Sequence, residues 1–441
     1  MVTGRAGALL AAGAATLPAW PAPWLGVAVM AGLLGSLWLV DLALAAPPSA
    51  VRLRRAGDRR VWLGGTATVT LWVHHPGPRT LRGEVRDAWV PSAGAGAPGM
   101  PERRRVRLRP GETAELVSAL TPTRRGDRPA VRVSVRSYGP LGLAHRQLSR
   151  RAADRATPPW TLRVLPRFPS RRILPEKLAR LRLLDGSTVT KGRGQGTEFD
   201  TLREYVTGDD VRSIDWRASA RRADVLVRTW RPERDRRVLC VVDTGRTSAV
   251  RLGDEPRLDT AIDAALLLAT LAARAGDRVD LLAVDVAVRA AVSGAARDLR
   301  LPRLVDALAP VAPALVETDF ELVAGEVLRR ERKRALVVLF TALEPEALGY
   351  GLLPVLPRLA ARHRVVVASV HDPLLAELTE APPRRAEDVY AAASAWRALA
   401  DRERIRAALT RSGVTVLDAP AGTFAAAVAD TYLGLKAAGR L

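Results

Sequence analysis

The most restrictive feature of this sequence is an apolar N-terminal stretch with almost no charge. Across the 41 residues Ala6–Ala46 the single charged residue is Asp41. A helix needs ~20 residues to cross the hydrocarbon core of a bilayer, so this stretch can hold two spans. The segment Pro18–Trp24 contains three prolines and two tryptophans, which favour a break at a membrane interface. We therefore predict a transmembrane helical hairpin in residues 1–47, with helices at roughly 4–19 and 24–46.

The charges that flank this stretch predict its orientation. Arg5 precedes the first span, and five arginines follow the second: Arg52, Arg54, Arg55, Arg59 and Arg60. The connecting turn is uncharged, so the positive-inside rule places both termini and the soluble domains in the cytoplasm, on an integral protein of the cell membrane. The alternative is a cleaved signal peptide. It is less favoured because no polar stretch separates the second apolar segment from the first.

The whole chain is strongly basic, with a formal net charge of +22 that comes mainly from arginine. Such a field favours acidic partners: nucleic acid, anionic lipid headgroups or an acidic protein. The bland alternative is a compositional bias toward Ala, Arg, Gly and Pro. The arginines are spread along the chain without a zinc-finger or RNA-binding motif, so we expect the lipid bilayer, and no nucleic acid, as a partner.

Residues 48–165 show the pattern of a small β-domain. Short alternating runs such as 67–73 and 131–135 are separated by turn signals rich in proline and glycine. This spacing predicts a β-sandwich-like domain. His74 and His75 are adjacent, so on a strand they face opposite sides and cannot chelate one ion together.

Residues 236–441 alternate between apolar strands and amphipathic helices, which predicts a doubly wound, mostly parallel sheet. The expected strands are 236–243, 279–284, 286–292, 335–341, 365–370 and 414–417. The second and third are too close to be joined by a helix and should form an antiparallel edge hairpin, a feature of von Willebrand A-type sheets. The fold class is therefore multidomain, with a C-terminal α/β von Willebrand A-like domain. Cys240, the one cysteine, lies in the first strand and is expected to be an inert core thiol.

Residues 166–235 form a linking region that contains the densest polar patch, between Lys191 and Arg221. Its candidate site residues are Glu198, Phe199, Arg203, Glu204, Tyr205, Asp209, Asp210, Asp215 and Trp216. So many opposite charges predict an ion-pair network that links the two domains, with Trp216 and Phe199 anchored in a core. A partner-docking surface and, less favoured, a catalytic site are the alternatives.

The order of short motifs in this patch resembles the signature of the domain-of-unknown-function 58 family. Glycines, Glu-Phe, Arg-Glu-Tyr, Gly-Asp-Asp and Asp-Trp follow one another across 31 residues. The hairpin, β-domain and A-type domain are also arranged as in that family, whose members are usually encoded beside MoxR-type AAA+ ATPases. The resemblance implies a non-enzymatic, membrane-anchored adaptor or assembly factor that binds such an ATPase.

Von Willebrand A domains often hold Mg²⁺ through Asp-x-Ser-x-Ser, a distant Thr and a later Asp. The corresponding candidate metal ligands in this sequence are Asp243, Thr247 and Thr318. The middle serine is replaced by Gly245 and the later aspartate by Ala342, so the site is degenerate and no cofactor is expected, with Mg²⁺ left open. In a metal-free site Arg246 is expected to pair with Asp243, and Glu344 is a substitute carboxylate. A metal-dependent hydrolase using Asp243, or a nucleic-acid-binding protein, is the alternative function.

Overall fold

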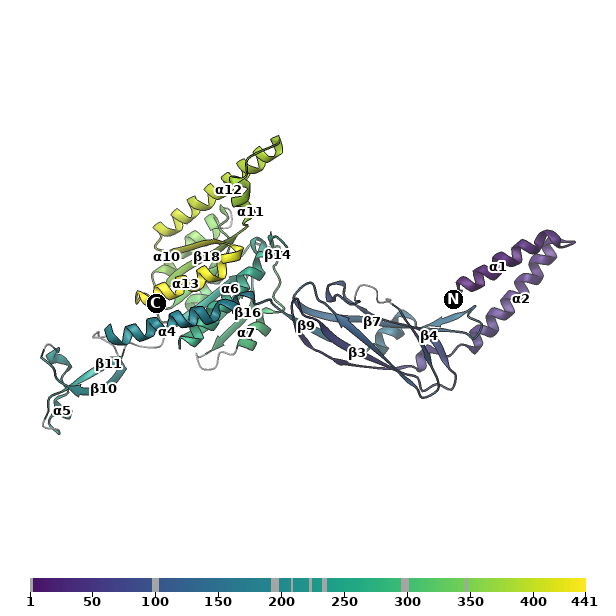
Figure 1. The fold of residues 1–441 in the computed structure, drawn as a ribbon, viewed down its shortest axis with the longest axis horizontal. Coiled ribbons are helices and arrows are strands. Elements are labelled where there is room, and N and C mark those ends of the chain that lie inside the picture. The colour runs from purple at the N-terminus through teal and green to yellow at the C-terminus, as the bar shows by residue number, and fades with distance from the viewer. Residues whose placement is uncertain are drawn as a thin grey trace. The chain divides into compact units, whose positions relative to one another are not determined.

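The computed structural model describes residues 3–96, 103–191, 198–207, 209–221, 224–231, 236–294, 301–345 and 348–441. For residues 19, 185–191, 198–201, 229–231 and 350 it describes the backbone alone. The chain divides into two compact units, Met1–Leu165 and Pro166–Leu441. Each is described separately below (Figure 1).

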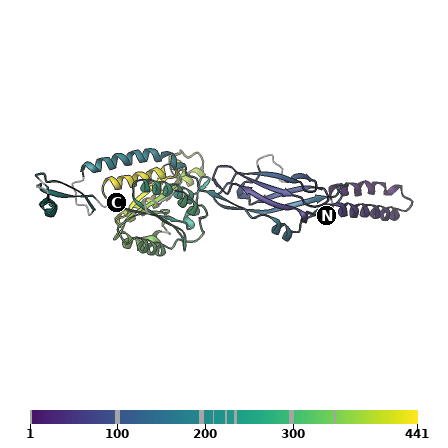
Figure 2. The ribbon, with the colours of Figure 1, turned by 90° about the horizontal axis from the view of Figure 1, so that it is seen from below.

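The first unit begins with a helical hairpin, α1 (Gly4–Thr16) and α2 (Pro23–Leu44), joined by a single 3-10 turn at Leu17–Ala19. The two helices lie side by side in both views (Figures 1 and 2). Glycines allow their close approach: a Cβ at Gly13 would lie 2.8 Å from the sulfur of Met30. Small residues at helix contacts are typical of membrane segments, where backbones pack closely.

Among the described residues, one helix, within Pro23–Ala50, is long and apolar enough to cross a membrane. It contains the 22 residues of α2, about 33 Å of helix, which matches a hydrocarbon core of ~30 Å. The 13 residues of α1 extend about 20 Å. The bounds of both helices lie close to those predicted, but α1 is too short to cross the core as a second span of that kind.

The rest of the first unit consists of two β-sheets and one short helix. Its strands are β1 (Arg52–Gly57), β2 (Arg60–Trp62), β3 (Ala67–His74), β4 (Leu81–Trp89), β5 (Arg104–Leu108), β6 (Thr113–Leu120), β7 (Gly126–Tyr138), β8 (His145–Gln147) and β9 (Thr161–Leu165). The helix is α3 (Arg150–Ala156). One sheet has the order β1-β3-β6 and the other β2-β9-β7-β4-β5, with β8 paired to β7.

Inward-facing side chains of the two sheets form a shared core. Leu71 of β3 is fully buried with Leu81 of β4 and Val135 of β7 in one apolar cluster. Alternate residues of each strand point outward, as the period of two requires. The adjacent histidines have separate partners: His74 contacts the Thr113 hydroxyl, while the buried His75 ring contacts the Arg79 carbonyl oxygen.

The second unit is a mixed α/β body built around a six-stranded sheet. The sheet strands are β12 (Arg237–Asp243), β15 (Arg278–Val284), β16 (Val288–Gly294), β17 (Leu336–Phe340), β18 (Arg364–His371) and β19 (Thr415–Pro420). The helices are α4 (Leu174–Lys191), α5 (Trp216–Ser219), α6 (Arg257–Arg274), α7 (Leu301–Leu308), α8 (Phe320–Arg330), α10 (Leu353–Ala360), α11 (Leu374–Glu380), α12 (Ala386–Arg411) and α13 (Ala421–Ala437). Short strand pairs are β10 (Glu198–Glu204) with β11 (Leu226–Arg231), and β13 (Arg251–Leu252) with β14 (Glu255–Pro256).

The strand order of the large sheet is β16-β15-β12-β17-β18-β19. All neighbours are parallel except β15 and β16, which form the antiparallel edge hairpin expected from their spacing. Helices cover both faces, with α6 and α13 on one and α8 and α10 on the other. Cys240 of the central strand β12 is fully buried, and burial raises the pKa of its thiol to about 12. The cysteine is therefore a core residue, as predicted.

Helix α4 lies in the stretch that the sequence assigned to a linking region, and it packs on the second unit. The Ser170 hydroxyl donates to Asp263 of α6 at 2.8 Å, and the Lys177 ammonium lies 2.9 Å from Asp430 of α13. In both figures α4 runs beside α13 (Figures 1 and 2). Residues 169–191 are thus part of the surface of the α/β body, while the signature motifs follow them.

Candidate functional site

The candidate metal residues lie where the central sheet changes winding direction. From β12 the chain continues to β15 on one side, and it later returns to β17 on the other. The carboxyl ends of β12 and β17 therefore meet at a topological switch point, the usual ligand position in open α/β sheets. Asp243 ends β12, and Thr341 directly follows β17.

Asp243 is the centre of a closed hydrogen-bond network. Its Oδ1 accepts from the backbone N–H of Gly245 at 2.8 Å and from the Thr318 hydroxyl at 2.5 Å. Its Oδ2 accepts from the hydroxyls of Thr341 at 2.6 Å and Thr247 at 3.4 Å. Burial raises the pKa of Asp243, and the hydroxyl donors oppose that rise. The structure thus brings the three candidate ligands Asp243, Thr247 and Thr318 together and adds Thr341.

The donor set suits a divalent cation poorly. A Cβ at Gly245 would lie 2.2 Å from the Thr318 hydroxyl oxygen, so the middle position has no room for a serine in this arrangement. Ala342 offers no side-chain oxygen, and Glu344 is held by Arg257 at 2.8 Å. No group of three His, Cys, Asp or Glu side chains that could hold a metal occurs among the described residues. One carboxylate surrounded by hydroxyl donors is best described as a structural polar knot that ties four segments together.

Two further charged groups at this edge are already paired. The Arg246 guanidinium lies 2.6 Å from Glu317, so the expectation that it pairs with Asp243 is wrong. Asp243 has no need of that charge because hydroxyl and amide donors fill its acceptor positions. Asp285, the carboxylate at the end of β15, accepts from the Thr244 hydroxyl and from Arg289.

A second polar cluster lies at the ends of β18 and β19. Asp418 accepts from Arg402 of α12 and lies 3.2 Å from the Nδ1 atom of His371. Burial acts to raise the pKa of Asp418, but the bonds from His371 and Arg402 outweigh it and hold the pKa below its ordinary value of 3.8. The Arg402 guanidinium also donates to Ser369. This arrangement fastens α12 to the sheet.

The signature residues form a small module of their own, which we define as residues 198–231. Strands β10 and β11 pair antiparallel, and Tyr205 extends the pairing through its N–H to the Val225 carbonyl. Arg203 lies 2.6 Å from Asp209, and Arg228 lies 2.8 Å from Asp215. These two ion pairs lie within the module, and the predicted role of the network in linking the two domains stays a prediction.

Two aspartates of the module begin its short helical turns. Asp215 accepts from the backbone N–H groups of Arg217 and Ala218 at the start of α5, and Asp210 accepts from that of Arg212. Asp210 and Asp215 therefore act as N-cap carboxylates, which satisfy the free amides at the start of a helix. The Arg203 guanidinium donates to the carbonyl oxygen of Glu204. The side chains of Glu198 and Phe199 lie outside the described residues.

The module does not bury Trp216, so the prediction that this residue is anchored in a core is wrong. Its side chain is 67% exposed. A two-stranded hairpin with a one-turn helix lacks a second layer to cover an indole, and the elements of the module chiefly contact one another. Other large apolar residues of the module are also exposed: Leu202, Val206, Val211 and Val225.

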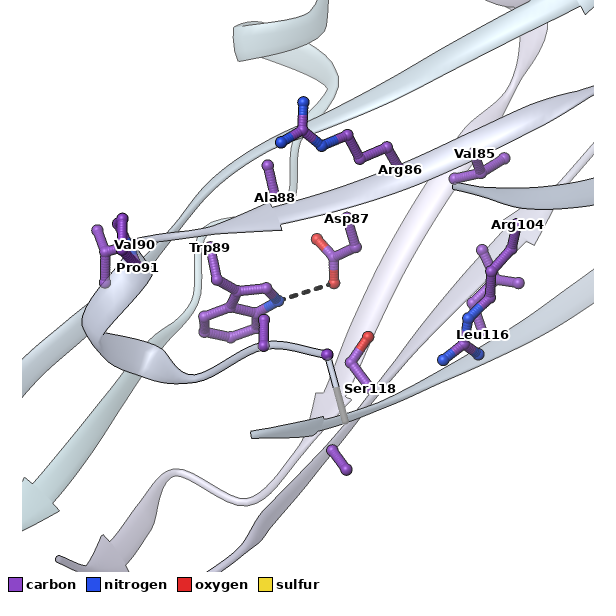
Figure 3. A pocket seen from close by; sticks show the side chains of 13 residues that line it. Val85, Arg86, Asp87, Ala88, Trp89, Val90, Pro91, Arg104, Leu116 and Ser118 are labelled. Atoms are coloured by element: carbon purple, nitrogen blue, oxygen red, sulfur yellow. Dashed lines mark hydrogen bonds between the residues drawn. The ribbon is translucent and has the colours of Figure 1, made fainter. Parts of the chain in front are cut away.

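A cavity of about 280 Å³ lies in the first unit between β4 and β6. Figure 3 shows Asp87 and Trp89 on the side of β4 that faces the cavity, while Arg86 points away. The Trp89 indole N–H donates to Asp87 at 3.1 Å, and the buried Arg55 also pairs with that carboxylate. Burial raises the pKa of Asp87, against the effect of Arg55. The carboxylate at the cavity wall is thus paired with its two neighbours, Trp89 and Arg55.

A family model and several curated proteins match part of this chain. The family described as "Protein of unknown function DUF58" matches residues 201–415, which supports the resemblance over that range. Uncharacterised proteins of Mycobacterium tuberculosis and Mycobacterium bovis are each 30% identical over 191 residues, 42% of this chain and 59% of theirs. The chain thus spans less than two thirds of the length of these relatives.

Likenesses to solved structures are weak. The CARDB domain of a Pyrococcus furiosus protein, solved in complex with di-metal ions, is 15% identical, covers 28% of this chain and 90% of its own, and has a TM-score of 0.19. A β-glucosidase of Listeria innocua is 13% identical, covers 22% of this chain and 16% of its own, and has a TM-score of 0.16. Neither likeness bears on the fold or the function.

Proposed function

We propose that this protein is a membrane-anchored, non-enzymatic adaptor that docks another protein through its signature module. The observation that carries the proposal is the exposure of apolar side chains on a hydrogen-bonded frame. Trp216, Val206 and Val211 are exposed, while the neighbouring carboxylates are committed to caps and ion pairs. Exposed tryptophan on a rigid support is typical of interaction sites.

The partner that we propose is a MoxR-type AAA+ ATPase, which the family resemblance implies. The anchor is the N-terminal hairpin, and the positive-inside rule favours a cytoplasmic position for both units. We interpret the two packed sheets as a β-sandwich and the α/β body as a von Willebrand A-like domain that has replaced its metal site with the Asp243 knot. An adaptor of this kind needs no catalytic residue, and the paired state of Asp243 and Asp285 agrees with that role.

The test is co-purification of the full-length protein from its native membrane, with and without ATP and Mg²⁺. Trp216→Ala removes the largest side chain that is exposed among the described residues of the module. Trp396→Ala is the matched control, because Trp396 of α12 is 61% exposed on a different element. We expect an AAA+ ATPase to co-purify with the wild type and with Trp396→Ala, and to be lost with Trp216→Ala.

Two other outcomes would redirect the proposal. Loss of the ATPase with Trp396→Ala alone would place the docking surface on α12. Absence of an ATPase under both nucleotide conditions would contradict the adaptor role.

A further inference from the structure

The end of α2 is fixed to the β-domain by a loop that also holds the start of α1. The Asp41 carboxylate accepts backbone hydrogen bonds from Leu141, Leu143 and Ala144, each at 2.7 Å. Thr3, which precedes α1, donates its N–H to the Leu143 carbonyl. We call loop 139–144 with these two partners the joint. Both ends of the hairpin therefore emerge at the same place on the β-domain.

Arginines complete the joint. Arg146 donates to the Leu42 carbonyl at 3.0 Å, and Arg79 donates to the Ala43 carbonyl. These carbonyls belong to the last turn of α2, where cations are favoured by the free C=O groups of the helix. Asp41 lies 17 residues after Trp24, about 26 Å along the helix, so a bilayer entered by the hairpin ends close to the joint.

Two exposed arginines, Arg82 and Arg107, lie on the strands next to the joint. In the sheet that contains β7, β4 and β5, Arg82 of β4 is directly opposite Arg107 of β5. On its other side Arg82 is opposite Tyr138 of β7. Tyr138 directly precedes Gly139, whose Cβ position would lie 2.2 Å from Asp41. Because Leu81 and Leu108 are buried, their strand neighbours Arg82 and Arg107 face outward.

No ion pair compensates these two like charges among the residues that the structure describes. Like charges directly opposite on antiparallel strands destabilise a sheet. Glu84, two positions along β4 on the same face, is opposite Arg105, lies 4.0 Å from it and is hydrogen-bonded to Tyr138. Within the described part of the chain the guanidinium groups of Arg82 and Arg107 make no hydrogen bond or ion pair, and both residues are exposed. An external anion placed between the two guanidinium groups would remove the repulsion.

We propose that Arg82 and Arg107, with Tyr138 beside them, form a binding site for the phosphate of an anionic phospholipid. Guanidinium groups bind phosphate oxygens with paired N–H donors, and a basic cluster next to a membrane span attracts anionic headgroups. The site rests on the membrane anchoring in the proposed function, and it fixes the β-domain against the bilayer surface. A nucleic acid would need a longer basic track than one pair at the base of a hairpin.

The test uses full-length protein in nanodiscs of mixed phosphatidylglycerol and phosphatidylcholine, with retained lipid counted by native mass spectrometry. We expect the wild type to retain phosphatidylglycerol preferentially. Arg82→Glu and Arg107→Glu should each reduce that preference at least about fivefold, the factor that corresponds to ~1 kcal/mol per arginine at a membrane surface. Arg124→Glu is the matched control, since Arg124 is exposed in the turn before β7, about 40 Å along that strand from Tyr138.

Four outcomes would overturn the site. Equal retention by the wild type and Arg82→Glu removes it, and an equal loss with Arg124→Glu shows an effect of net charge alone. Binding of a labelled DNA duplex that is lost in Arg82→Glu, with lipid retention unchanged, assigns the pair to nucleic acid. If the wild type fails to enter nanodiscs at all, the anchoring half of the proposed function fails together with the lipid site.

Discussion

The Asp41 carboxylate accepts a 2.7 Å hydrogen bond from the backbone N–H of Ala144, 103 residues further along the chain. Asp41 is the one charged residue in the apolar N-terminal stretch, and it is fully buried. A buried carboxylate is costly unless donors satisfy it. Three backbone amides do so here, which explains how this apolar stretch accommodates a charge at this position.

Replacement of Asp41 by Asn should open the joint. An amide side chain offers one acceptor oxygen and places an N–H₂ group against amides that also donate, so at least one buried donor loses its partner. The expected cost is about 1–3 kcal/mol of local stability, or roughly 5- to 150-fold faster hydrogen exchange in loop 139–144. Exchange of the full-length protein in detergent, followed by mass spectrometry of peptides from this loop, measures it.

Ser36→Ala is the control for that experiment. Ser36 lies on the same helix, is exposed, and donates only to the Leu33 carbonyl of its own helix. Its exchange in loop 139–144 should equal that of the wild type. Unchanged exchange in Asp41→Asn as well would show that the joint is held by other contacts.

Gly245→Ser tests whether the Asp243 knot can revert to a metal site. The new Cβ would lie 2.2 Å from the Thr318 hydroxyl oxygen and 2.9 Å from the Val316 carbonyl oxygen. We expect overpacking to lower stability by about 1–3 kcal/mol, seen as a lower thermal midpoint. Gly325→Ser on α8 is the control, because a Cβ there meets nothing within 4 Å.

The opposite result for Gly245→Ser would be informative. A variant as stable as the wild type that binds Mg²⁺ stoichiometrically in a calorimetric titration would show that the loop carrying Thr318 opens to admit the ion. The knot would then be a closed form of a metal site, and the hydrolase alternative would regain support.

Replacement of Asp263 of α6 by Asn should make the protein more stable than the wild type at neutral pH. Burial raises the pKa of Asp263 to about 6, above its ordinary value of 3.8, while bonds from Ser170 oppose the rise. A raised pKa means that the folded state binds the proton more tightly, so stability from this group is greatest below 3.8 and falls until pH 6. Asp263→Asn keeps the acceptor for Ser170 and removes the charge.

The expected gain for Asp263→Asn is about 1–2 kcal/mol above pH 6, and it should vanish below pH 4. Urea unfolding at pH 7 and pH 4 measures it, with Asp254→Asn as a control at an exposed position. A gain that is equal at both pH values would mean that ionisation of Asp263 is not its source.

The sequence was sufficient to predict elements whose apolar residues follow a simple pattern along the chain. The run around Cys240 is apolar on both faces and became the central strand, and the short spacing between β15 and β16 required their antiparallel pairing. Helix α12 went unassigned because its buried residues, Ala395, Arg402 and Leu409, are seven positions apart and one of them is charged. Burial of Arg402 depends on Asp418, a partner that no local pattern reveals.

The site was predictable only in part for the same reason. Asp243, Thr247 and Thr318 were recognisable by spacing, whereas Thr341 joins them through the pairing of β12 with β17. Its position at the end of a predicted strand was the available signal. Trp216 was expected to be buried because it is large and apolar, but burial needs an opposing layer, and sequence spacing does not show that the module has one.

The last prediction separates the frame of the signature module from its surface. Asp215 accepts from two amides of α5 and from Arg228, which hold the turn against β11. These bonds lower the pKa of Asp215, so they stabilise the module above pH 3.8 and are lost as pH falls through the lower folded value.

A two-stranded hairpin is marginally stable alone. Asp215→Ala should therefore speed proteolytic cleavage between β10 and β11 at pH 7, several-fold by gel assay, and abolish partner binding. Trp216→Ala should abolish binding with cleavage unchanged, and faster cleavage in both variants would show that Trp216 supports the frame after all.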